Sequence, residues 1–246
     1  MSENEPLLTN NPYHGPGEIK ELSIELGSFF ERTIRPCMGE LCGVTLFVFV
    51  GTMSVSGASS LLGVALAHGL MIALLVAALG NVSGGHLNPA VTLGIFLTGG
   101  IGPLNAILYI ISQLIGSLTG AALTRGVLSK GAFENIAGGA SSVGTDSTVR
   151  EALLAEVILT SILILTVLLT AVDISTKTSL APIAIGFAVI VDILAGASIS
   201  GASLNPARSL GPAVAMSTYS SSVWDNHWLY WVGPGLGSLL AVVLHR

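Results

Sequence analysis

The chain alternates between long apolar stretches and short polar ones, and this pattern predicts several membrane-spanning helices. A helix needs about 20 mostly apolar residues to cross a bilayer. Six stretches of this chain meet that length. We therefore expect transmembrane helices over residues 37–57, 62–81, 104–124, 151–171, 180–198 and 227–244.

Two further apolar stretches are interrupted by glycine and proline and are too short to cross. One follows the second predicted span and runs to Leu97, and the other follows the fifth and runs to about Met216. Irregular backbone at membrane depth is tolerated only where it is buried in protein or lines a water-filled cavity. The pattern therefore predicts two re-entrant loops, each ending in a half-helix.

The two re-entrant stretches are copies of one sequence. Residues 82–94 read VSGGHLNPAVTLG and residues 199–211 read ISGASLNPARSLG, with eight of the 13 positions identical. Each half contains three predicted spans, so the two copies enter the membrane in opposite senses. We expect an inverted repeat, with repeat one over about 37–124 and repeat two over about 151–246. In such proteins the working site lies where the two interruptions meet.

Composition supports a membrane protein and excludes other classes. The chain is 51% hydrophobic and 9% charged, whereas a soluble domain has about 25% charged residues. Nine Lys and Arg in a chain of net charge −5 give no basis for binding nucleic acid. No nucleophile–base pair, metal-ligand spacing or phosphate loop is evident, so we expect neither an enzyme nor a cofactor. Cys37 and Cys42 fall on different faces of one predicted helix, which argues against a disulfide between them.

The first 36 residues are polar, and we expect an N-terminal tail over 1–36 followed by one membrane domain over 37–246. The spacing of Ile19, Leu22, Leu26 and Phe29 fits an amphipathic helix on the membrane surface, and disorder is the equal alternative. Lys and Arg are more numerous on the side of the two termini, which favours cytoplasmic termini. The plasma membrane is the expected location, with intracellular membranes as the alternative.

The Asn-Pro-Ala sequences have a specific physical meaning. Proline is favoured in the first turn of a helix, and asparagine just before it can cap the helix N-terminus. Asn88-Pro89-Ala90 and Asn205-Pro206-Ala207 therefore start two half-helices whose electropositive ends face each other near the bilayer midplane. Both ends would repel cations. The side-chain amides of the two asparagines can donate hydrogen bonds into a passage, and the carbonyls of 84–87 and 201–204 can accept them.

This arrangement resembles the aquaporin, or major intrinsic protein, family over nearly the whole chain from Pro36 onward. The paired Asn-Pro-Ala sequences, Arg208 after the second copy and the paired acids Glu40 and Glu156 carry the resemblance. Arg35-Pro36-Cys37 and the fifth-span residues 186–189 and 191–196 resemble the aquaporin-8 branch. The resemblance implies an all-α membrane protein of six transmembrane helices and two re-entrant half-helices, assembled as a homotetramer.

The resemblance also implies roles for particular residues. The two glutamates would hold the loop backbone near the half-helices. A narrow filter would be lined by His68, Ile193, Ala202 and Arg208. A charge inside a membrane is costly unless it faces water or a partner, so Arg208 would face the passage. The alternative is a buried ion pair of Arg208 with Asp192 or a glutamate. Arg208 would also keep the His68 imidazole neutral.

The filter implies passage of water and small neutral solutes in a lipid bilayer. Ile193 stands where strict water channels of the family commonly carry a second histidine, so we expect a wider passage that admits ammonia, hydrogen peroxide and, as a further candidate, urea. Thr52 replaces a cysteine that aquaporin-8 relatives can carry, which argues against gating by oxidation there. Asp192 is expected to be a buried hydrogen-bond acceptor rather than a proton relay. A structural or adhesive protein of the same fold and an ion-coupled transporter are the alternatives.

Overall fold

The structure is a computed structural model that describes residues 25, 27–57 and 60–246. Most of the predicted N-terminal tail, including the first part of the predicted surface helix, lies outside these residues. Within the described part the chain is helical and contains no strand. Six of its helices are long and apolar enough to cross a membrane, as the sequence predicts. The elements are η1 (Phe30–Ile34), α2 (Arg35–Gly57), α3 (Leu61–Leu79), α4 (Pro89–Leu97), α5 (Pro103–Val127), α6 (Lys130–Asn135), η2 (Ala137–Gly139), α7 (Val149–Val167), η3 (Leu168–Val172), α8 (Ala181–Ser200), α9 (Pro206–Met216), η4 (Ser221–Trp224) and α10 (Leu229–His245).

The first crossing helix begins earlier than its apolar stretch predicts. It runs continuously over Gly27–Gly57 rather than from residue 37, and the turn η1 within it is π-helical. Arg35 and Glu31, one helical turn apart, form an ion pair of 2.6 Å on this extension. The prediction placed the start of this span at residue 37 because the residues before it are polar. Polar residues do not end a helix, however, because charged side chains can pair along its exposed face. The connection between α5 and α7 contains the short elements α6 and η2.

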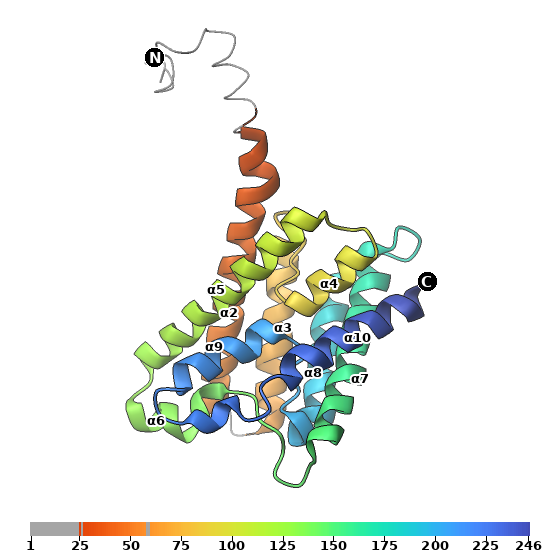
Figure 1. The fold of residues 1–246 in the computed structure, drawn as a ribbon. Helices are drawn as coiled ribbons and strands as arrows, with labels where there is room; N and C mark the ends of the chain where they lie inside the picture. Colours follow the sequence, from red (N-terminus) through yellow and green to blue (C-terminus); the bar gives the residue numbers. More distant parts are fainter. Residues whose placement is uncertain (1–24, 26, 58–59) are drawn as a thin grey trace, which may run out of the picture.

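The two half-helices α4 and α9 start near each other and run away from the centre of the molecule in opposite directions (Figure 1). The three long-helix contacts that enclose them are α2 with α5, α7 with α10, and α3 with α8. The first two are equivalent pairs of the two halves, and the third joins the halves. This is the arrangement that an inverted repeat requires.

Glycines set the close approach of these helix pairs. A Cβ on Gly116 of α5 would collide with the carbonyl oxygen of Leu41, and one on Gly237 of α10 would approach the carbonyl oxygen of Val157. Each of those carbonyls belongs to the residue after a buried glutamate, Glu40 or Glu156. Small residues at membrane helix contacts allow such close packing. The two halves therefore use the same contact to bring α5 and α10 against the helices that carry the acids.

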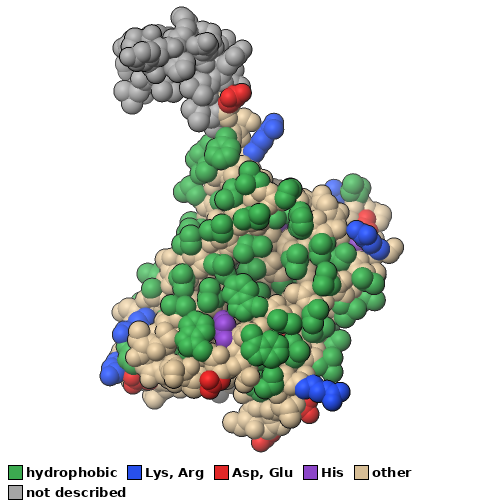
Figure 2. Space-filling view, viewed as in Figure 1, with side chains coloured by type: hydrophobic (Ala, Val, Ile, Leu, Met, Phe, Trp, Pro, Cys, Tyr) green, Lys and Arg blue, Asp and Glu red, His purple; other side chains and the backbone are tan. Residues whose placement is uncertain are grey.

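The distribution of side chains is inverted relative to a soluble protein. Figure 2 shows hydrophobic side chains over the middle of the visible face, with Lys, Arg, Asp and Glu towards its two ends. Leu74 of α3 and Val243 of α10 are 67% and 72% exposed, whereas Glu40 and Glu156 are fully buried. An apolar exterior of this extent fits hydrocarbon rather than water.

Candidate functional site

The two Asn-Pro-Ala sequences each cap a half-helix as their residue types predict. The Oδ1 atom of Asn88 accepts a hydrogen bond of 2.8 Å from the backbone N–H of Ala90. The Oδ1 atom of Asn205 accepts from Ala207 (3.0 Å) and Arg208 (3.2 Å). Pro89 and Pro206 occupy the first helical positions, where a missing N–H costs nothing.

The two asparagines also tie the two loops to each other. The Nδ2 atom of Asn88 donates to the carbonyl oxygen of Leu204 at 2.8 Å, and the Nδ2 atom of Asn205 donates to that of Leu87 at 2.9 Å. Each side-chain amide therefore donates one of its two N–H groups to the opposite loop. The second N–H group can donate to a molecule in the cavity. The carbonyl oxygens of Leu87 and Leu204 thus each accept one bond from an asparagine, and each has a second lone pair for a further donor.

Two buried glutamates hold the loops from behind. Glu40 accepts backbone N–H bonds from His86 (3.0 Å) and Leu87 (2.6 Å), and Glu156 accepts them from Ser203 and Leu204, both at 2.8 Å. In each loop a serine hydroxyl also donates to the acid: Ser83 to Glu40 and Ser200 to Glu156. These bonds satisfy backbone donors that would otherwise be buried without partners.

The loops and the predicted filter residues line one cavity of about 340 Å³. Asn88 and Asn205 line it together, and so do His68, Ile193, Ala202 and Arg208. The lining continues to Gly100, Ala171 and Val172, on the side of the molecule where α10 ends. Both repeats contribute to this lining, with Asn88 from the first and Asn205 from the second.

His68 is held in position by its own helix and by a glycine. Its Nδ1 atom lies 2.9 Å from the carbonyl oxygen of Val64, which can only accept, so Nδ1 carries a proton. In the neutral ring Nε2 is then an acceptor. A Cβ on Gly51 of α2 would come within 2.5 Å of Nε2. Gly51 therefore makes room for the ring, and any larger residue there would displace His68.

Arg208 is bound by neutral oxygens rather than by an acid. Its Nη1 atom donates to the carbonyl oxygen of Gly139 and to the hydroxyl of Ser141, both at 2.9 Å. Among the described residues no ion pair involves Arg208. The alternative interpretation of this arginine, an ion pair with Asp192 or a glutamate, therefore has no support in the geometry. Because the guanidinium has five N–H groups, others are left for the cavity.

Several side chains of the site were not singled out by the sequence. Gln113 donates to both Glu40 (2.7 Å) and Thr92 (2.9 Å). Tyr109 and Tyr230 donate to the carbonyl oxygens of Ser83 (2.8 Å) and Ser200 (2.7 Å), where the loops begin. Ser117 donates to the carbonyl oxygen of Ala207 and Ser238 to that of Ala90. Aligning the third helices of the two halves would have paired the tyrosines and the serines, because each pair is 121 residues apart, 109 to 230 and 117 to 238.

Asp192 differs from expectation. The carboxyl is 2% exposed, and its Oδ2 atom is buried without a hydrogen-bond partner among the described residues. Among the described residues, no protein group therefore donates the hydrogen bond that the sequence predicts at this atom.

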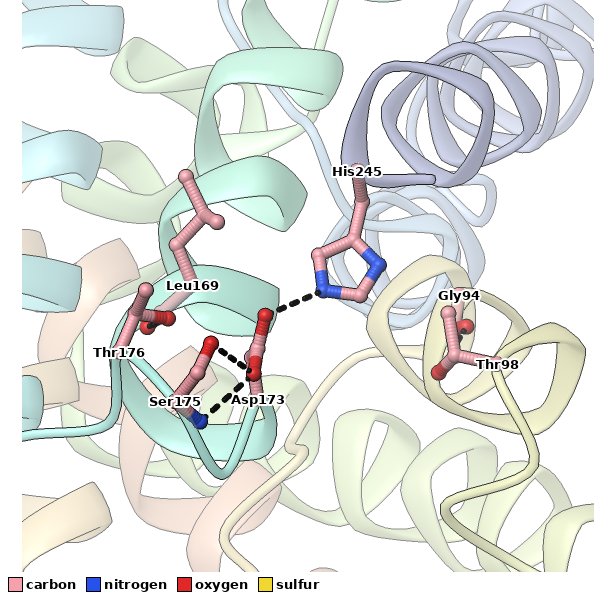
Figure 3. A network of polar contacts seen from close by, with 7 residues as sticks. All are labelled: Gly94, Thr98, Leu169, Asp173, Ser175, Thr176 and His245. Atoms are coloured by element: carbon pink, nitrogen blue, oxygen red, sulfur yellow. Dashed lines mark hydrogen bonds and ion pairs between the residues drawn. The ribbon is translucent and has the colours of Figure 1, made fainter.

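A separate polar network lies on the side of the molecule where α10 ends (Figure 3). Asp173, just after η3, lies 3.5 Å from Nε2 of His245 and accepts from the amide (2.8 Å) and hydroxyl (2.7 Å) of Ser175. The hydrogen bonds from Ser175, together with nearby His245, hold the pKa of Asp173 below its ordinary value. The network fixes the connection between η3 and α8, beside the inner lining of the cavity at Ala171 and Val172.

Comparison with known proteins places these features in a family. The model of the family described as "Major intrinsic protein" matches residues 29–245. Aquaporin-8 of Rattus norvegicus is 48% identical over 223 residues, covering 89% of this chain and 83% of the relative. Aquaporin TIP1-2 of Musa acuminata is 41% identical over 227 residues, covering 87% and 86%.

A solved structure supports the fold. The aquaglyceroporin from Plasmodium falciparum superposes with a TM-score of 0.74, at 23% identity, over 86% of this chain and 94% of that one. At this identity the likeness concerns the fold alone. It agrees with the predicted fold of six crossing helices and two half-helices, which is thereby confirmed.

Proposed function

The chain belongs to the major intrinsic protein family, and on that premise we propose that it is a passive channel for water and small neutral solutes. Family membership and the six apolar helices make it an integral, multi-pass membrane protein. The observation that carries the proposal is the single cavity that both asparagines, His68 and Arg208 line together.

The proposed conduction path excludes protons at its centre. Asn88 and Asn205 each retain one N–H after their cross-loop bonds, and both sit at the electropositive ends of half-helices. A water molecule that accepts from both amides cannot also accept from its neighbouring water. This breaks a proton-conducting chain, while the two helix ends and Arg208 repel cations.

His68, Ile193, Ala202 and Arg208 form the proposed filter. Arg208 and His68 offer a donor and an acceptor, and the buried side chains of Ile193 and Ala202 are apolar. A passage with polar groups on one side and apolar groups on the other suits small neutral molecules that can replace some water contacts. We propose ammonia and hydrogen peroxide as solutes besides water, with urea as a third candidate.

The membrane context is also a proposal. The resemblance implies a homotetramer in which each protomer has its own passage, and we propose this assembly here. The larger number of Lys and Arg on the side of the termini supports cytoplasmic termini. We propose the plasma membrane as the location, with intracellular membranes as the alternative. We further propose that residues 37–246 form the channel domain, preceded by a cytoplasmic segment.

Stopped-flow measurements on proteoliposomes test the proposed function. We expect vesicles with the purified protein to shrink faster than empty vesicles under an osmotic gradient, and to exclude protons. Replacing Arg208 by valine should raise the urea-to-water permeability ratio, because the guanidinium and its positive charge are lost. Water flux equal to that of empty vesicles would contradict the channel and favour a structural or adhesive protein. Saturating, ion-dependent flux would favour a transporter.

A further inference from the structure

Arg208 is connected to the backbone of Asn205 through three buried hydroxyls. Nη1 of Arg208 lies 2.9 Å from Oγ of Ser141, which lies 2.9 Å from Oγ of Ser209. Oγ of Ser209 lies 2.5 Å from Oγ of Ser203, and Ser203 donates to the carbonyl oxygen of Asn205 at 3.0 Å. The three serines are 8%, 0% and 5% exposed, in the order 141, 209 and 203.

The direction of each hydrogen bond in this chain follows from the two ends. Each hydroxyl has one proton to donate. Ser203 gives its proton to the carbonyl of Asn205, so it must accept from Ser209. Ser209 must then accept from Ser141, which leaves Ser141 to accept from the guanidinium. All bonds point the same way from a charged donor to a carbonyl, and bonds in such a series polarise and strengthen one another.

The first repeat contains the same internal link but directs it elsewhere. His86 and Thr92 occupy the positions of Ser203 and Ser209, and Nδ1 of His86 lies 3.2 Å from Oγ1 of Thr92. Thr92 is then joined to Glu40 through Gln113. In that repeat Val91 stands where the second repeat has Arg208. The hydrogen bond between Ser209 and Ser141 is therefore a feature of the second repeat, which also contains Arg208.

The last residue of η2 and the segment after it provide the two anchors of the guanidinium. Besides Ser141, the carbonyl of Gly139 accepts from Nη1 at 2.9 Å. Gly139 has a φ of +73°, and a Cβ there would collide with Thr52. Gly139 is thus held by its conformation and by α2, whereas Ser141 is held by the hydroxyl series. The two N–H groups of Nη1 thus have one anchor each, and together the anchors fix the orientation of the planar guanidinium.

We propose that Ser141, acting through Ser209 and Ser203, is a positioning residue that sets the orientation of Arg208 in the passage and so its solute selectivity. This inference rests on the proposed function. Without the Ser141 hydroxyl, Nη1 keeps one acceptor, and the guanidinium is free to turn about its bond to Gly139. The width of the passage beside Arg208 then varies as the guanidinium turns. A solute larger than water therefore passes more often.

The test compares urea and water permeability of the same proteoliposomes, because their ratio does not depend on how much protein is folded. We expect Ser141→Ala to raise the urea-to-water ratio about fivefold, the fold-change that a hydrogen bond of ordinary net strength implies. Ser209→Ala should raise the ratio in the same direction. Ser141→Thr keeps a hydroxyl and should restore the native ratio.

Two further variants separate this role from general stability. Thr124→Val removes a fully buried hydroxyl that donates to the carbonyl oxygen of Gly120 within α5 at 3.1 Å and does not line the cavity, and it should leave the ratio unchanged. Adding Ser141→Ala to Arg208→Val should have no further effect, since the serine acts through the arginine.

The outcomes distinguish the two proposals. If Arg208→Val changes the ratio and Ser141→Ala and Ser209→Ala do not, the positioning role is overturned and the channel function stands. An equal change in Thr124→Val also overturns it, because the effect would then not be specific to Arg208. If the native protein conducts no water, the proposed function itself fails, and the positioning role fails with it.

Discussion

At the scale of single residues, Ile193 is the proposed filter position where a change of side chain gives the clearest test. It is 6% exposed and lines the cavity together with His68 and Arg208. The side chain offers no hydrogen bond, so it sets the width and the apolar character of the passage. A polar residue at this position would change the apolar character of the passage, and a polar residue of different shape would also change its width.

We predict that Ile193→His lowers ammonia and hydrogen peroxide permeability more than water permeability. The imidazole adds a polar group next to the guanidinium and reduces the apolar wall that these solutes contact. Permeability of all three should be measured in one proteoliposome preparation, with Ile193→Leu as the volume-conserving control. Equal losses for all three would contradict the assignment of Ile193 to the filter.

At the scale of helices, the crossings depend on glycines facing backbone carbonyls. Gly116 of α5 meets Leu41 and Val44 of α2, whereas Gly126 of the same helix has nothing within 4 Å of a Cβ built on it. A side chain at the first position must push the helices apart, and one at the second would enter open space. The two glycines therefore form a matched pair for testing the crossing.

We predict that Gly116→Val lowers the thermal stability of the purified protein in detergent and Gly126→Val does not. Overpacking of a tight contact costs about 1–3 kcal/mol. The crossing also positions Glu40, so the first variant should lose water permeability in parallel. Similar melting temperatures for the two variants would show that this contact is not a stabilising one.

The connection between η3 and α8 is a second element whose stability can be tested. Ionised Asp173 accepts two hydrogen bonds from Ser175 and faces His245 (Figure 3). Because folding lowers the pKa of Asp173, its stabilising effect is complete above the ordinary unfolded value of about 3.9. The effect is lost as the pH falls towards the lower folded value.

Hydrogen exchange should therefore show faster exchange of the Ser175 and Lys177 amides in Asp173→Asn than in the native protein. In the native protein, the part of this protection that Asp173 provides should be retained down to about pH 4 and decrease only below it. The exposed Asp225, substituted in the same way, should leave these amides unchanged. Native-like protection in Asp173→Asn would refute the role of this carboxylate.

At the scale of the whole molecule, both repeats of the chain contribute to the cavity. His68 and Asn88 of the first repeat line it together with Asn205 and Arg208 of the second, and the exterior of the chain is apolar. We therefore expect each protomer of an assembly to contain its own passage. Conduction per chain should not depend on which neighbours are present.

We predict that the purified protein forms a complex of four 25.1 kDa chains and that each conducts independently. Light scattering in mild detergent measures the first part. For the second, native chains are co-assembled with Ala202→Trp, a variant expected to block its own passage. Water permeability should fall in proportion to the blocked fraction. A steeper fall would mean that protomers act together, and a monomeric mass would contradict the tetramer.

The sequence determined the helices, the inverted repeat and the residue types of the site by itself. The length of an apolar span is set by bilayer thickness, and a proline after a capping asparagine is favoured where a helix begins. These are local constraints, so the crossings, the half-helix starts at Asn88 and Asn205, and the family could be identified from residue patterns. The helical segment ahead of residue 37 could not, because a helix continues through polar residues where its exposed face can accommodate them.

Only the tertiary structure decided how the polar groups of the site are paired. The cross-loop bonds of the asparagines and the bond from Arg208 to Ser141 join residues that are distant in sequence. The structure also shows that Oδ2 of Asp192 has no protein partner among the described residues. A serine after a short helical turn has no local feature that indicates such a partner. Buried hydrogen bonds form between groups that packing brings together, and packing depends on the whole chain at once.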